Sequence, residues 1–191
     1  MFKKHLSFFA VVLLAILIST GSASAEGTTV KFSAYADAYA ATDNAENPSS
    51  GLFSTSFGFR SFSVVNGQKD NFGINIAQVS ADVNHNNLAR GKVTLHYGDM
   101  PQQVWTGLGV GYPAVQEAYA GIMVLENLWV DAGYFLTHIG GESLLPKDNW
   151  LSSHSMVTFY EPFYQAGLRF SYEADKLTAQ LHVLNGNGIF E

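Results

Sequence analysis

The chain has 191 residues with 10 basic and 16 acidic side chains, and its formal net charge of −6 argues against a nucleic-acid partner. It contains no cysteine, which excludes both a disulfide framework and a lipid anchor on cysteine. Its length predicts a single domain.

The first 25 residues show the three regions of a secretory signal peptide. Residues 3–5 are basic, residues 6–18 are almost entirely apolar, and Ala23-Ser24-Ala25 is a cleavage site of the A-x-A type. The apolar run is short for a spanning helix, which needs about 20 residues. We therefore expect residues 1–25 to be removed by cleavage before Glu26. The mature part then loses two lysines, which leaves 8 basic residues against 16 acidic ones.

Seven β-rich segments with alternating apolar and polar residues fill the mature part, residues 26–191. Most reach the 9–11 residues or so that a tilted strand needs to cross a bilayer, whereas soluble strands usually have about five or six. No later apolar run is long enough for a spanning helix, so a β-barrel is the only membrane-spanning architecture that fits. The expected strands are 30–40, 71–84, 89–97, 115–124, 128–136, 163–172 and 177–184.

The connections between these segments alternate in length, as in outer-membrane barrels, where periplasmic turns are short and outer loops are long. A β-sandwich has no reason to keep this alternation. The segment 52–65 also resembles a strand, and we interpret it as the upper part of a hairpin; as an eighth spanning strand it would break the pattern. The long connections are 41–70, 98–114 and 137–162, and the short ones are 85–88, 125–127 and 173–176.

Each expected strand has one apolar and one polar face. A soluble sandwich would turn the apolar face inward, whereas a membrane barrel turns it toward lipid and lines a wet lumen with the polar face. In the barrel we expect Leu168, Phe170, Ala179 and Leu181 to face lipid. The expected lumen-lining residues are Lys92, His96, Gln165, Arg169, Gln180 and His182.

The expected strand 71–84 changes phase along its length. Its apolar residues stand at even positions up to Ile76 and at odd positions from Val79 onward. One extra residue near Ala77-Gln78 would restore the facing, so the pattern predicts a β-bulge there.

No motif for catalysis, cofactor binding or metal binding stands out, and we expect none of these. The glycine-rich stretch 107–112 lacks the following helix that a phosphate-binding loop requires. Glu142 and Glu161 have no fixed separation, which glycoside hydrolysis would need. Four residues of one long connection lack the spacing of a structural zinc site, namely His138, Glu142, Asp148 and His154.

Several segments, taken in order, resemble one known family. They are "FSAYADAYA" (32–40), "NFGINIAQVSADV" (71–83), "AGYFLTHIGGE" (132–142) and "EPFYQAGLRFSY" (161–172). The chain resembles the OmpL-like β-barrel porins of bacterial outer membranes, most strongly over 132–186. The resemblance implies an all-β, antiparallel up-and-down transmembrane barrel with a water-filled channel and no catalytic residues.

The expected function is passive diffusion of small hydrophilic solutes through such a barrel. Members of the resembled family continue beyond Asn185-Gly186 with further strands, and seven strands is an odd number where bacterial barrels have even numbers from 8 upward. We therefore expect an incomplete barrel, the N-terminal part of a larger one. Expected partners are outer-membrane lipid, small solutes, the barrel-assembly machinery and a second copy in a homo-oligomer. A soluble periplasmic β-sandwich that binds a ligand remains the alternative.

Overall fold

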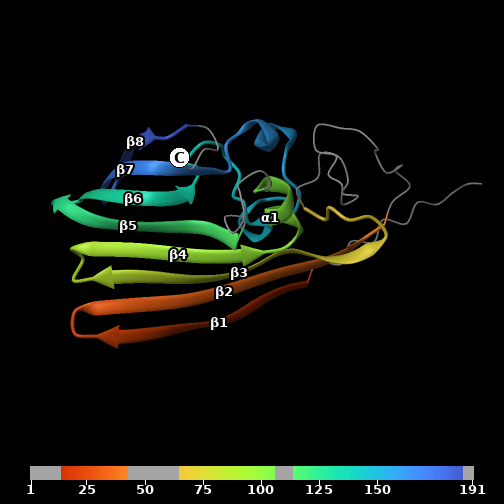
Figure 1. Ribbon diagram of the computed structural model, residues 1–191, viewed down its shortest axis with the longest axis horizontal. Helices are drawn as coiled ribbons and strands as arrows, with labels where there is room; N and C mark the ends of the chain where they lie inside the picture. Colours follow the sequence, from red (N-terminus) through yellow and green to blue (C-terminus); the bar gives the residue numbers. More distant parts are fainter. Residues whose placement is uncertain (1–13, 43–64, 106–113, 187–191) are drawn as a thin grey trace, which may run out of the picture.

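The computed structural model describes residues 14–42, 65–105 and 114–186, which form one antiparallel sheet with its eight strands in sequential order (Figure 1). No helix within these ranges has the length and apolar character needed to span a membrane. The helical elements are α1 (Asp99–Val104) and the 3-10 helices η2 (Pro146–Asp148) and η3 (Met156–Tyr160). The strands are β1 (Leu14–Ala25), β2 (Thr28–Ala41), β3 (Asn71–His85), β4 (Ala89–Tyr97), β5 (Val115–Leu125), β6 (Leu128–Leu136), β7 (Tyr164–Ala174) and β8 (Leu177–Leu184).

Seven of these strands, β2 to β8, confirm the seven predicted from the sequence. The additional strand β1 lies within the segment predicted as a signal peptide and pairs along β2 from Ala25↔Thr28 to Leu14↔Ala38. Cleavage before Glu26 would remove β1 and leave β2 at the edge of the sheet; cleavage itself stays a prediction. The strand-like segment 52–65 lies outside the described residues except for Val65, which is buried.

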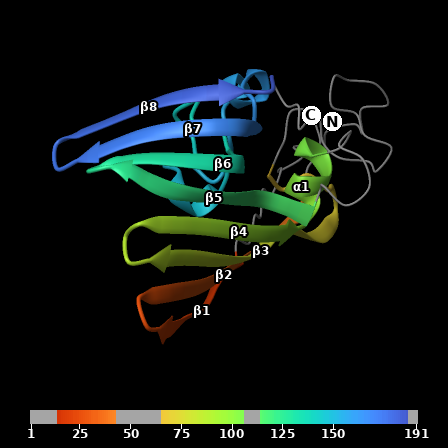
Figure 2. The same cartoon turned by 60° about the vertical axis from the view of Figure 1, so that its left-hand side comes forward.

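The sheet is open, with β1 and β8 at its two edges (Figure 2). Each strand pairs only with its neighbours in the chain, which is the up-and-down topology predicted from the sequence. The fold class is therefore all-β, and the described residues form an incomplete barrel wall.

Short turns and long connections lie at opposite ends of the sheet, as the alternation predicts (Figure 1). Asn86, Asn87 and Asn127 occupy the short turns with φ between 49° and 63°. Asparagine tolerates this left-handed conformation better than most residues, so these positions fix tight turns between long strands.

The bulge in β3 is present but lies two to three residues earlier than predicted. Asp37 pairs with Ile76 and Ala38 with Ile74, so Asn75 is the extra residue. Asn75 is fully buried, and its side chain donates to Asp37 at 3.3 Å and accepts from the Asn66 amide at 2.6 Å. This polar anchoring turns Ile76 into the interior, whereas its even position had suggested the outer face.

The apolar core does not lie on the apolar face of the sheet. It lies at the end that carries the long connections, where α1 and the β6–β7 connection pack against strand residues. One cluster is formed by Tyr35, Val65, Ile76 and Met100, and the second by Trp105, Tyr134, Tyr164 and Ala166.

Candidate functional site

The two faces of the sheet differ sharply in chemistry. The outer face carries apolar side chains with large exposed fractions, such as Leu181 at 65%, Val183 at 58% and Ile122 at 57%. A soluble sandwich would cover such a face with a second sheet, but the described residues form one sheet only. An uncovered apolar face on long strands is what a lipid-facing barrel wall requires.

The inner face carries a polar row that crosses the sheet from β2 to β8. The strand register places one residue of each strand directly beside the next, so the side chains share one face. We call this set the inner row. Its members are Thr29, Asn84, Arg90, Gly121, Asp131, Arg169 and His182.

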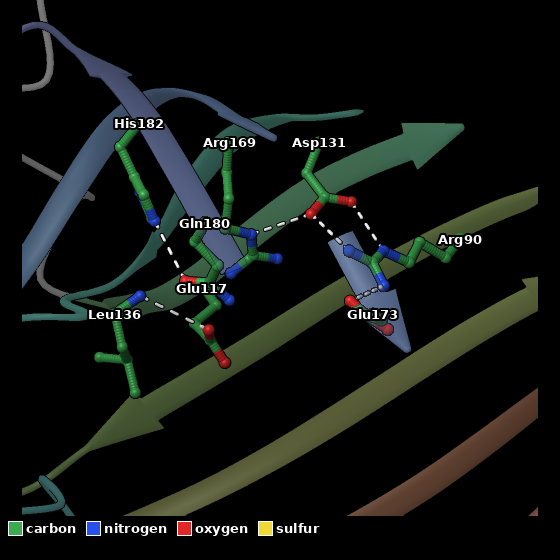
Figure 3. A network of polar contacts seen from close by, with 8 residues as sticks. All are labelled: Arg90, Glu117, Asp131, Leu136, Arg169, Glu173, Gln180 and His182. Atoms are coloured by element: carbon green, nitrogen blue, oxygen red, sulfur yellow. Dashed lines mark hydrogen bonds and ion pairs between the residues drawn. The ribbon is translucent and has the colours of Figure 1, made fainter. Parts of the chain in front are cut away.

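Asp131 is the centre of the inner row and is held by two arginines (Figure 3). Arg90 donates from Nε to Oδ1 and from Nη2 to Oδ2, both at 2.8 Å. Arg169 donates from Nε to Oδ2 at 2.9 Å. A fully buried carboxylate needs such pairing, because an unpaired charge out of water is strongly destabilising. Arg90 also donates to Glu173 at 2.9 Å, which adds a second residue of β7 to the network.

Gly121 creates the space in which Arg90 and Asp131 meet. It stands between them in the register, on the intervening strand β5. A Cβ atom at position 121 would lie 2.0 Å from Asp131 Oδ1. The arginine can therefore reach across β5 only because position 121 has no side chain.

Aromatic rings fix the planes of both guanidinium groups. The Cζ atom of Arg90 lies 4.4 Å from the ring centroid of Trp129. Arg169 lies 4.7 Å from the Tyr119 ring and 4.9 Å from the Phe135 ring. Cation–π contacts of this length favour one orientation of each guanidinium group.

The six residues predicted to line a lumen all lie on the inner face, in different surroundings. Lys92 pairs with Glu117 at 2.8 Å, and Arg169 belongs to the inner row. His182 stacks on His138 with the ring centroids 3.8 Å apart and lies 3.1 Å from Gln180 Oε1.

The other two predicted residues are covered. His96 is buried against Trp105, with the ring centroids 4.7 Å apart. Gln165 is buried and lies 3.0 Å from Nδ1 of His138. The structure therefore places Arg169 and His182 in the inner row with Gln180 beside them, and it covers His96 with Trp105. Exposure of the set to a wet lumen stays a prediction.

The sequence patterns did not predict Arg90, Glu117 and Gly121 as members of this site. Arg90 and Lys92 are two residues apart in one strand, and this spacing could have indicated that both lie on the inner face. Glu117 has the same parity as Tyr119 and Gly121, because the pairing is regular from Arg90↔Gly121 to Thr94↔Glu117 and shifts only beyond Glu117, where Leu95 pairs with Val115. Alternation along this strand could therefore have indicated Glu117 as well.

The polar residues of the β6–β7 connection make separate contacts. Glu142 accepts hydrogen bonds from the Ser155 amide and hydroxyl and from Thr158, and these bonds hold the pKa of the Glu142 carboxyl below its usual value. His154 lies 2.9 Å from the Ser143 carbonyl, and Asp148 pairs with Lys147. Within the described ranges, no group of three or more histidine or acidic residues is arranged to hold a metal ion.

An apolar outer face and a charged inner face on one up-and-down sheet define the wall of a membrane β-barrel. The family described as "Putative beta-barrel porin-2, OmpL-like" matches residues 29–191. The chain belongs to this family, which confirms the resemblance seen in the sequence. Comparisons with curated proteins and with solved structures find no match.

Proposed function

We propose that this protein is a porin-like barrel of the outer membrane that lets small hydrophilic solutes cross by passive diffusion. It reaches the periplasm through a signal peptide cleaved before Glu26. The observation that carries the proposal is the division of one sheet into an uncovered apolar face and an inner face with a buried ion network. Lipid satisfies the first face, and a water-filled channel satisfies the second.

Several charges on the inner face are paired with a charge of opposite sign. Three cations are each paired with an anion, so the part of the wall from β4 to β7 is polar without a strong field of either sign. Such a wall favours neutral and zwitterionic polar solutes and discriminates weakly between small ions. The paired residues are Arg90, Lys92 and Arg169 with Glu117, Asp131 and Glu173.

Closure of the channel requires strands beyond the open sheet. Unpaired backbone groups at the two edges would each cost several kcal/mol in hydrocarbon. Further strands, or a second copy of the chain, must therefore pair with the edges during insertion by the barrel-assembly machinery.

Liposome swelling tests the function directly. The protein isolated from outer membranes with detergent is reconstituted, and entry of neutral sugars of increasing size is measured beside heat-denatured protein and empty liposomes. We expect size-limited swelling with the native protein only. In planar bilayers with a salt gradient, we expect a reversal potential near zero. Extraction without detergent together with no swelling would contradict the proposal.

A further inference from the structure

The β6–β7 connection extends beyond the strands that it joins. Its base is closed by a hydrogen bond of 3.2 Å from the Thr137 amide to the Phe163 carbonyl. Its middle part packs both against the cluster that contains Tyr134 and Tyr164 and against β2 and β3 residues. Leu144 and Leu145 contact the cluster that contains Tyr35, and the Lys147 amine lies 5.6 Å from the Tyr35 ring centroid.

This contact spans much of the sheet. Between β6 and β2 lie β3, β4 and β5, so the two strands are about 19 Å apart along the wall at about 4.8 Å per strand. Tyr35 is two residues from Asp37, which is fully buried on the inner side, and three residues from Phe32, which is exposed on the outer side. The Tyr35 side chain therefore lies on the inner side of the sheet. The connection therefore reaches β2 across the inner side of the sheet.

Internal hydrogen bonds give this part of the connection a fixed shape. The Ser143 amide donates to Asn149 Oδ1 and the Asn149 side chain donates to the Ser143 carbonyl, both at 2.7 Å. His154 meets the same carbonyl at 2.9 Å. Glu142 accepts hydrogen bonds from Ser155 and Thr158, which attach the second half of the connection to the first.

The helix α1 packs beside this part of the β6–β7 connection. Met100 and Trp105 are fully buried, and Val104 packs against both apolar clusters. Tyr39 donates to the Asp99 carboxylate, and Gln68 donates to it at 2.8 Å, which ties α1 to β2. We call residues 143–149 together with 99–105 the inner plug.

We propose that the inner plug is a constriction within the channel, and that Leu144 and Leu145 determine solute size selectivity by holding it against β2. This inference rests on the proposed function. The packing of the two leucines keeps the segment inside, because withdrawal would expose them and the Tyr35 cluster to water. A stiff segment at that place narrows the cross-section open to solutes.

Photo-crosslinking tests the placement without any transport measurement. A benzophenone amino acid replaces Lys147 in the protein in its native membrane, and the crosslinked peptides are identified by mass spectrometry. We expect crosslinks to the β2 peptide around Tyr35. The matched control carries the same group at Leu151, which is 70% exposed in the same connection, and should not label β2. Equal labelling of β2 from both positions, or none from 147, would overturn the proposal.

A solute-exclusion assay tests whether Leu144 and Leu145 determine the size limit of the channel. The variant Leu144→Ser/Leu145→Ser should shift the swelling limit toward larger sugars and raise single-channel conductance, whereas Leu151→Ser should match the unmodified protein. An unchanged limit in the double variant, with the 147-to-β2 crosslink intact in the unmodified protein, would overturn the constriction role. Absence of swelling from unmodified protein would instead defeat the proposed function, and the constriction role with it.

Discussion

The carboxylate of Asp131 occupies the space in which a side chain at position 121 would stand. The two residues are register partners on β5 and β6, and a Cβ at Gly121 would come within 2.0 Å of Asp131 Oδ1. Arg90 approaches the same carboxylate from β4, on the other side of Gly121. The buried ion pair between Arg90 and Asp131 therefore depends on the absence of a side chain at position 121.

The variant Gly121→Ala should displace the carboxylate from Arg90 and destabilise the barrel. Because a buried charge loses part of its pairing, we expect a loss of about 2 kcal/mol or more in the free energy of unfolding, measured by urea titration in bilayers. Gly141→Ala is the control, since a Cβ there meets nothing within 4 Å. The combined variant Gly121→Ala/Asp131→Asn should lose less than the sum of the two single losses, and strict additivity would contradict the coupling.

The variant Asp131→Asn leaves Arg90 and Arg169 without their shared counter-ion. We expect a cost of about 3–5 kcal/mol, the usual effect of removing one partner from a buried ion pair. Glu173→Gln is the matched control, because Glu173 is 45% exposed and its pair with Arg90 contributes about 1 kcal/mol or less. Asp131→Asn also adds one net positive charge to the inner face, so its reversal potential in a salt gradient should move toward anion selectivity.

Positions 180 and 181 on β8 separate the two faces within one strand. Leu181 lies opposite Phe170, and Gln180 lies opposite Ser171, which is buried on the inner side. We expect Leu181→Arg to cost about 2–4 kcal/mol near the bilayer midplane and Gln180→Arg to cost much less. Folding titrations in bilayers measure both. Equal costs would contradict lipid contact by Leu181, Leu168, Phe170 and Ala179.

Glu142 gives the β6–β7 connection a pH dependence. Hydrogen bonds from Thr158 and from the Ser155 amide lower the pKa of Glu142 below 4.5, the ordinary value of the carboxyl group. A lowered pKa stabilises the closed connection above that ordinary value, and the stabilisation is lost as pH falls through the pKa of the folded state. Amide hydrogen exchange at Ser155, corrected for intrinsic rates, should therefore speed up on acidification.

The variant Glu142→Gln should abolish this acid-dependent increase, while Glu126→Gln in the short β5–β6 turn should retain it. An identical response in all three proteins would show that another group opens the connection.

The sequence was most informative where the physical signal is local. Alternation with a period of two located β2 to β8, and the turn asparagines bounded several of them. The bulge at Asn75 was misplaced, because it depends on hydrogen bonds to Asp37 on β2 and to Asn66 in the connection before β3, which alternation does not reveal. No short sequence pattern predicts the inner row around Gly121 or the inner plug. Both bring together residues that are far apart in the sequence and meet only in the folded sheet.

The strand β1 overlaps the predicted signal peptide, so the N-terminus of the exported protein shows whether β1 belongs to the barrel wall. In the structure, residues 14–25 pair along β2, yet the same residues contain the end of the apolar run and the cleavage site of the predicted signal peptide. We expect N-terminal sequencing of the protein purified from outer membranes to begin at Glu26. The β2 edge of the mature protein is then free for another strand, and its amides should be protected from exchange in the closed barrel. A mature N-terminus upstream of Leu14 would contradict cleavage and make β1 part of the wall.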